Sequence, residues 1–317
     1  MHNNLKLLLR LSLGIGILLA LCWSVDLKAV AANLTNLNVL WFVWLCLLAV
    51  LIKILKAYKW WLLLRARELD VSAWQSTRLY FAGYLVGALT PAGVGSDIYR
   101  TSALSNFQKN NDVVSTLLLE RLIGYAVLAA AAVLSMPFSA RYLDPVVFSV
   151  IWTVVVIALL LACLLLVLLR SGLFDSLIRY VLARMNLADK FSNLWSAFSE
   201  FRHHKGLLTL FTLLTGFEIL ILVLISYTAA RALGIHAPFI YLLSLIPLMQ
   251  FLIRLPISFQ ALGIQEGLYV YVFVAAGYPA SDGLSVSILL RAVEIILVFL
   301  PGLIMLVSRS HIRASQQ

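Results

Sequence analysis

Long apolar runs dominate the pattern along this chain and predict its fold class. Six runs approach the roughly 20 residues that a helix needs to cross a bilayer. They lie at about 7–25, 39–64, 113–137, 146–169, 207–230 and 284–307. We therefore expect an all-α polytopic membrane protein with six full spans. The first run resembles a signal peptide, but Asp26 and Lys28 follow it closely, so we interpret it as the first span.

Two further apolar regions, at about 79–104 and 238–278, are interrupted by residues that break helices. Proline removes a backbone donor and glycine permits tight turns, so the interruptions free backbone groups at membrane depth. Such backbone is tolerated there only when it is buried in protein or lines a cavity. The residues concerned are Pro91, Gly93, Gly95, Pro256, Ser258 and Gly263. Polar residues beside both breaks favour a polar cavity over a simple kink.

The composition excludes a soluble globular protein. Hydrophobic residues make up 62% and charged residues 12% of the 317 residues, whereas soluble domains contain about 45–50% and about 25%. The net charge of +10 does not indicate nucleic-acid binding, because the Lys and Arg residues lie in short loops and at helix ends. The cytoplasmic loops of membrane proteins carry such an excess.

The basic loops predict the topology. They precede the first run, follow the second, fill segment 170–206 and end the chain, which places these segments and both termini in the cytoplasm. Segment 79–104 must then enter and leave on the cytoplasmic face as a re-entrant hairpin, and segment 238–278 must enter and leave on the outer face. The two segments approach the midplane from opposite sides, as in the inverted repeats of secondary transporters. Whether 238–278 is one hairpin or two short spans stays open.

We expect one integral membrane domain, 1–317, made of two related halves. The halves are about 1–169 and 207–308, and an amphipathic cytoplasmic segment, 170–206, joins them. In each half a Gly-rich break leads to an acid, and the next long run carries an acid and an arginine. These are Asp97 with Glu120 and Arg121, and Glu266 with Arg291 and Glu294.

Ionised side chains at membrane depth are the candidate functional residues. Each costs about 2.5–3.5 kcal/mol at the bilayer centre, so it faces a partner or a water-filled cavity. Arg291 and Glu294 are three residues apart, so they can form an ion pair with a structural or a substrate-binding role. The adjacent Glu120 and Arg121 diverge around a helix, so at least one needs another partner. The candidate substrate-binding residues are Asp97, Arg100, Glu120, Arg121, Arg254, Glu266, Arg291 and Glu294.

Four more charges lie inside long runs. Lys53, Lys56 and Lys59 recur every three residues, and we interpret this stripe mainly as side chains that snorkel towards the cytoplasmic headgroups. Glu218 has no obvious local partner and is a candidate for a cavity or a proton relay. The surplus of arginine near the breaks suits an anion, because guanidinium binds phosphate through paired donors.

No motif indicates soluble catalytic chemistry. The chain contains no Walker A loop, GxSxG elbow or GxGxxG turn, and no HExxH or CxxC pattern supports a metal. The three cysteines lie in apolar runs without paired spacing. We therefore expect no cofactor, no metal, no catalytic residue and no nucleic-acid partner.

Several stretches resemble the lysylphosphatidylglycerol synthase transmembrane-region family, also called flippase-like proteins. They are LTPAGVGSDIYRTSAL, RLPISFQALGIQEGLYVYVFVAAG, SVSILLRAVEIILVFLPGLI and the basic-Trp element AYKWWLLL, and the resemblance extends over about residues 5–307. It implies a multi-pass plasma-membrane protein of bacteria or archaea that handles lipids. The chain ends at Gln317 without a soluble synthase domain, so we expect no tRNA-dependent aminoacyl transfer.

The leading hypothesis is a lipid translocase, which moves an anionic, modified or polyprenyl-linked lipid across the membrane with possible coupling to a proton or ion. The arginines would hold the headgroup between the breaks while the chains stay in the bilayer. One alternative is a membrane-embedded lipid-modifying transferase with Glu120 or Glu266 as general base. Another is a non-transporting partner of a lipid synthase. A homo-oligomer is compatible with all three hypotheses.

Overall fold

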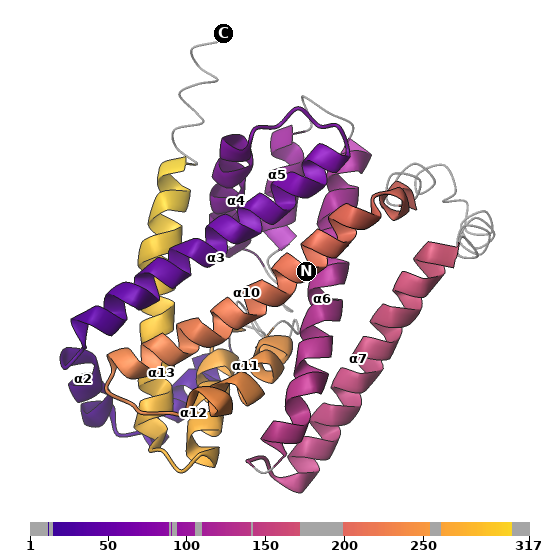
Figure 1. Cartoon of the computed structure of the whole chain (residues 1–317). Helices are drawn as coiled ribbons and strands as arrows, with labels where there is room; N and C mark the ends of the chain where they lie inside the picture. The colour runs from indigo at the N-terminus through magenta and orange to yellow at the C-terminus, as the bar shows by residue number, and fades with distance from the viewer. Residues whose placement is uncertain are drawn as a thin grey trace.

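The computed structural model describes residues 12, 15–88, 90, 94–104, 110–140, 142–171, 199–253 and 261–305, and these contain helices but no strand. Figure 1 shows the helices packed as one bundle. An unlabelled helix, Ile15–Ser24, precedes α2. The helices that follow are α2 (Leu27–Thr35), α3 (Val39–Ala66), α4 (Ala73–Ala88), α5 (Val94–Leu104), α6 (Asn110–Ser139), α7 (Pro145–Ser171), the 3₁₀ turn η2 (Glu200–His203), α10 (Lys205–Ala232), α11 (Phe239–Ile253), α12 (Ile264–Ala275), α13 (Ala280–Glu294) and the π-helical η4 (Ile295–Phe299).

Four helices of the described residues are long and apolar enough to cross a membrane: Val39–Ala66, Asn111–Ser139, Lys205–Ala232 and Ala280–Met305. The bent pair Ile15–Ser24 and Leu27–Thr35 gives a fifth if it counts as one span. The expected span at 146–169 coincides with the 27-residue helix α7. Its apolar segment Phe148–Leu161 is shorter than the four spans above, so α7 is not counted with them. The chain is therefore a multi-pass membrane protein, but the expectation of six full spans is not confirmed.

The N-terminal part departs from a straight span. The helix Ile15–Ser24 meets α2 at an angle of 91°. Asp26 caps the first turn of α2, because its Oδ1 accepts from the backbone N–H of Lys28 at 2.9 Å and of Ala29 at 3.3 Å. This cap stabilises the beginning of α2 directly after the corner.

Helices α3 and α10 lie side by side and run in opposite directions. The N–H of Asn38, which precedes α3, donates to the carbonyl of Ala232 at the end of α10 at 2.7 Å. At the other end, Leu63 near the end of α3 packs with Phe201 of η2 and with Phe211 near the beginning of α10. The positions of the other helices can therefore be described by the end of α3 to which they are close.

Helices α4 and α5 form a pair that begins and ends near the C-terminal end of α3. Trp60 and Leu64 of α3 pack with Leu79 of α4, Leu104 at the end of α5 and Val113 at the beginning of α6. Between the two helices, Gly83 brings the backbone of α4 close to α5, since a Cβ there would lie 3.1 Å from Arg100 Cγ. The segment 79–104 is thus a hairpin of two helices, as the sequence predicts.

Helices α11 and α12 form the second pair, which begins and ends at the opposite end of α3. The phenol of Tyr278, just after α12, donates to the carbonyl of His236, just before α11, at 3.0 Å. Helices of 15 and 12 residues are about 22 and 18 Å long, shorter than a hydrocarbon core about 30 Å thick. The lengths and the shared end favour one hairpin over two short spans.

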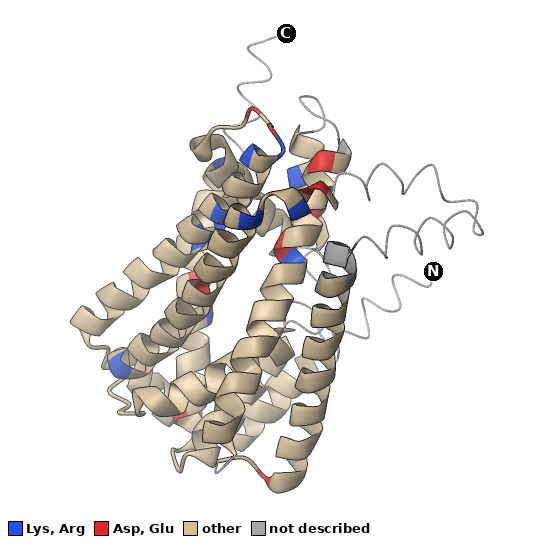
Figure 2. Cartoon of the chain, turned by 45° about the vertical axis from the view of Figure 1, so that its right-hand side comes forward, with Lys and Arg blue, Asp and Glu red and all other residues tan. Residues whose placement is uncertain are grey.

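The two hairpins enter the bundle from opposite ends. In Figure 1, α4 and α5 lie at the upper end and α11 and α12 at the lower end. In Figure 2 the Lys, Arg, Asp and Glu positions lie mainly in the upper half of the bundle. Large apolar side chains such as Leu134, Val146 and Leu213 are exposed, which fits contact with lipid.

Arg67 forms ion pairs at the end of the bundle where α3 finishes. It follows α3 and pairs with Asp112 at 2.5 Å and with Glu200 of η2. The hydrogen bond from Arg67 lowers the pKa of the Glu200 carboxyl. This contact connects the ends of α3, α6 and η2.

Helices α12 and α13 approach so closely that only glycine fits at one contact. A Cβ at Gly283 would lie 2.6 Å from the carbonyl oxygen of Tyr269 and 2.7 Å from Val270 Cα. We expect Gly283→Ala to lower the free energy of unfolding by about 1–3 kcal/mol through overpacking, measured by denaturant titration in detergent. Gly216→Ala is the control, because a Cβ there meets nothing within 4 Å; equal stability of the two variants would contradict the close packing.

The opposite entry of the hairpins predicts the sidedness of labelling. Single cysteines at Asp70 and Gln108, which flank the α4–α5 hairpin in sequence, should react with a membrane-impermeant reagent from the same side. A cysteine at the exposed His236 should react only from the other side. Labelling of Asp70→Cys and Gln108→Cys from different sides would contradict the hairpin.

Candidate functional site

Thr90 satisfies the backbone at the first break. Its hydroxyl donates to the carbonyl of Gly87 at the end of α4 at 2.9 Å and accepts from the N–H of Gly95 at the beginning of α5 at 2.8 Å. A Cβ at Gly95 would lie 2.6 Å from the Thr90 side chain, so this glycine is required for close approach. Pro91 and Gly93 lie outside the described residues.

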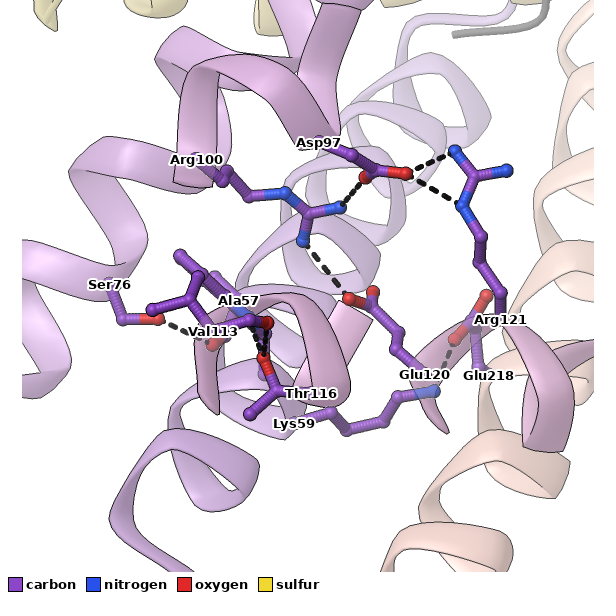
Figure 3. A network of polar contacts seen from close by, with 11 residues as sticks. Ala57, Lys59, Ser76, Asp97, Arg100, Val113, Thr116, Glu120, Arg121 and Glu218 are labelled. Carbon is purple, nitrogen blue, oxygen red and sulfur yellow. Dashed lines mark hydrogen bonds and ion pairs between the residues drawn. The ribbon is translucent and has the colours of Figure 1, made fainter. Parts of the chain in front are cut away.

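The hairpin group, defined as Asp97, Arg100, Glu120 and Arg121, joins α5 to α6 (Figure 3). Asp97 Oδ1 accepts from Arg100 Nη2 at 2.7 Å, and Asp97 Oδ2 accepts from Arg121 Nε at 2.7 Å and Nη2 at 2.5 Å. Arg100 Nη1 also donates to Glu120 Oε2 at 3.0 Å. The adjacent Glu120 and Arg121 therefore bind separate partners, as their divergence on the helix predicts.

Arg100 is the buried centre of this group. Only 6% of the residue is exposed, and its guanidinium carbon lies 4.9 Å from the Trp60 ring centroid and 5.1 Å from that of Tyr80. Cation–π contact stabilises a charge that has lost its water. Its Nε is buried and has no hydrogen-bond acceptor among the described residues.

The α3–α10 group consists of Lys56, Lys59 and Glu218. Lys59 Nζ lies 2.7 Å from Glu218 Oε2, and Lys56 Nζ lies 3.2 Å from Glu218 Oε1. Lys59 also donates to Thr215 at 2.8 Å. These lysines point into the bundle, so the expectation that they snorkel is wrong, because a buried carboxylate on α10 attracts them more than distant headgroups do. Glu218 has its partners across the helix interface rather than along its own helix.

The α13 group consists of Lys53, Tyr84 and Glu294, from three helices. Lys53 Nζ lies 2.9 Å from Glu294 Oε1 and 3.7 Å from the Tyr84 ring centroid. The Tyr84 phenol donates to the same carboxylate oxygen. Glu294 does not pair with Arg291, contrary to one sequence-based alternative, because each side chain has a partner on another helix. The helix becomes π-helical directly after Glu294, an irregularity often found at functional sites.

Glu266 satisfies the backbone at the second break. Its Oε2 accepts from the N–H of Gly263 at 2.7 Å, and its Oε1 accepts from Arg291 Nε at 2.6 Å. Gly263 has φ +78°, a conformation that glycine adopts without strain. Arg291 Nη2 is buried and lacks an acceptor among the described residues. Arg254, Pro256 and Ser258 lie outside those residues.

The same pairing recurs beside both breaks. In each case an acid in the first turn after the break pairs with an arginine on the next long helix. The pairs are Asp97 with Arg121, 24 residues apart, and Glu266 with Arg291, 25 residues apart. Beside each break, one buried arginine nitrogen has no protein acceptor in the described part of the chain; these are Arg100 Nε and Arg291 Nη2.

Together we name these groups of ion pairs the charge ladder. Lys53, Lys56 and Lys59 lie three residues apart on α3, and Arg291 and Glu294 lie three residues apart on α13. The ladder therefore includes residues of both hairpins, and its members are Arg121, Asp97, Arg100, Glu120, Lys59, Glu218, Lys56, Glu294, Lys53, Arg291 and Glu266.

A pocket of about 580 Å³ lies between α5 and α6 beside the hairpin group. Its lining is Asp97, Ile98, Thr101, Ser102, Val114, Leu117, Leu118 and Arg121. Within the described ranges, no cluster of three or more His, Cys, Asp or Glu residues could hold a metal ion.

Sequence reasoning missed Tyr84, Trp60 and Tyr80 as members of this site. Their aromatic rings lie on apolar helices, where they resemble ordinary packing residues. The three-residue spacing of the lysines indicated a common face on α3, but nothing in the sequence showed that α10 and α13 lie opposite that face.

The α3–α10 group predicts a stability effect. Glu218→Gln leaves two lysines without their carboxylate, and breaking a buried pair costs about 3–5 kcal/mol. We expect a fall of this size in the free energy of unfolding in detergent, and partial recovery in Glu218→Gln/Lys59→Met. Glu200→Gln is the control, because the Glu200 side chain is 57% exposed; an equal effect of the two single variants would contradict a special role for the buried pair.

Comparison with known protein families finds a match over most of the chain. The family described as the lysylphosphatidylglycerol synthase TM region matches residues 7–302. No curated protein and no solved structure shows a significant match. The matched range includes both breaks and every member of the charge ladder. The chain belongs to the lysylphosphatidylglycerol synthase transmembrane-region family.

Proposed function

We propose that this protein is a lipid translocase that moves lipids with an anionic headgroup between the leaflets of a prokaryotic plasma membrane. The observation that carries the proposal is the charge ladder between two oppositely entering hairpins. A transmembrane family named for lipid synthases supports a lipid as the substrate. The basic end, where α3 ends, would face the cytoplasm.

Ion-pair exchange explains how a headgroup could move along the ladder. Breaking a buried ion pair leaves an uncompensated charge and costs about 3–5 kcal/mol. A phosphate that replaces a carboxylate on an arginine keeps that arginine paired, so each step avoids the full cost. The acyl or prenyl chains would remain in the bilayer throughout.

Two features favour an anion over a cation. The ladder contains six cations, Lys53, Lys56, Lys59, Arg100, Arg121 and Arg291, and five carboxylates, Asp97, Glu120, Glu218, Glu266 and Glu294. Arg100 Nε and Arg291 Nη2 have no acceptor among the described residues, and a phosphate oxygen could accept a hydrogen bond from each of them.

The recurring acid–arginine pairs support an inverted repeat. Two related halves that enter from opposite sides give two similar conformations, one open to each leaflet. Helix α13 connects the halves through Glu294, and its π-helical turn gives that helix a local irregularity next to the contact.

A lipid-modifying transferase is the alternative from another class, and the site gives it less support. A general base needs an oxygen that can reach the substrate proton. Both oxygens of Glu266 are occupied by Gly263 and Arg291, and Glu120 holds Arg100. Formation of a lipid product in detergent, where there is no second leaflet, would favour the transferase. If the protein is instead a non-transporting partner of a lipid synthase, replacing the charged residues of the ladder with neutral ones should leave its function unchanged.

Transport by exchange predicts a loss of scrambling. Arg100→Gln and Arg291→Gln remove a charge beside each break, and we expect each to slow the translocation of labelled phosphatidylglycerol in liposomes at least about tenfold. Arg291→Lys, which keeps the charge, should retain more activity. Arg231→Gln at the other end of α10 is the control, since the contacts described for the Arg231 side chain are with the Trp41 and Tyr227 rings and not with the ladder. Equal rates in all folded variants would refute the proposed site.

A further inference from the structure

The pocket between α5 and α6 combines a partly exposed ion pair with an apolar wall. The side chain of Arg121 is 40% exposed and that of Asp97 is 21% exposed. Ile98 is 64% exposed and Leu118 is 44% exposed. The pocket is therefore open along the outside of the hairpin, and its exposed apolar side chains suit contact with acyl chains.

Arg121 has donor capacity left for a ligand. Its Nε and Nη2 both bind Asp97 Oδ2, and in Figure 3 its remaining nitrogen points away from Asp97. Asp97 does not depend on Arg121 alone, because Arg100 holds its other oxygen at 2.7 Å. An incoming anion can therefore take Arg121 while Asp97 stays paired.

The pocket has a polar rim and a charged interior. Thr101 and Ser102 lie near the end of α5, within about 5 Å of Leu104 along the helix axis, whereas Arg121 lies about 16 Å from the beginning of α6. A lipid of the leaflet at this end would meet the hydroxyls first and the guanidinium further in. Val114, Leu117 and Leu118 provide apolar contact beside this path.

We infer that this α5–α6 groove is a lateral docking site for a phospholipid with an anionic headgroup, entered from the bilayer at the end where α3 finishes. Arg121 binds the phosphate, and the exposed Ile98 and Leu118 contact the chains. The inference rests on the proposed function and names the entry to the charge ladder, since Asp97 connects Arg121 to Arg100.

Lipid selectivity at the groove tests this inference. A bimane on Ile98→Cys, in protein whose Cys22, Cys46 and Cys163 are replaced by alanine, is reconstituted with mixtures of brominated and plain lipids. We expect brominated phosphatidylglycerol to quench the probe with a relative binding constant about tenfold above that of brominated phosphatidylcholine. Equal binding constants for the two lipids would overturn the proposal.

Substitutions separate the groove from general surface charge. Arg121→Gln should bring the ratio close to one, and Arg121→Lys should keep most of the preference. Asp97→Asn should raise the ratio, because it removes the carboxylate that competes with the phosphate; a fall would contradict exchange at Arg121. Arg65→Gln, an exposed cation at the same end but outside the groove, should leave the ratio unchanged, and an equal loss there would also overturn the proposal.

This readout is independent of transport. A preference for phosphatidylglycerol that depends on Arg121, without any scrambling activity, would keep the docking site and refute the translocase. Scrambling that depends on Arg100 and Arg291, without a preference at Ile98, would keep the translocase and refute this entry.

Discussion

The cost of an ionised side chain in a medium without water governs this structure. A charge at the centre of a bilayer costs about 2.5–3.5 kcal/mol on insertion scales, and an isolated buried charge costs several kcal/mol. The protein meets this constraint by pairing its deep charges between helices. Lys59 with Glu218 and Lys53 with Glu294 connect α3 to α10 and α13, so the same contacts that make the charges tolerable also set the rotation and register of the long helices.

The two hairpins obey the corresponding rule for backbone. A helix that breaks at membrane depth exposes amides that must find partners. Thr90 provides the partner at the first break, and Glu266 at the second. Glu266 also pairs with Arg291, so at the second break the backbone and the charge ladder share one carboxylate. A movement of Arg291 would thus displace Glu266 and change the hydrogen bond at the beginning of α12.

Pairing of this kind is compatible with change. Asp97 is shared by two arginines and Glu218 by two lysines, so one partner can leave without stranding the carboxylate. When two cations share one carboxylate, exchange of one partner costs less free energy than the complete separation of a pair. Ion pairs that can exchange partners can bind an anionic headgroup in passing, whereas purely structural ion pairs cannot. This property is the physical basis of both proposals.

The sequence alone determined the class of the protein and much of its plan. Apolar runs located α3, α6, α10 and α13, helix breakers located both hairpins, and the basic loops indicated their opposite entry, because hydrophobicity and charge act locally along the chain. The tertiary structure decided the corner at Asp26 and the partners of the buried charges. Lys53 and Glu294 are 241 residues apart, and periodicity shows only which residues share a face of one helix. Which face meets which follows from packing, and therefore the structure replaced snorkelling lysines and a local Arg291–Glu294 pair with one ladder between the hairpins.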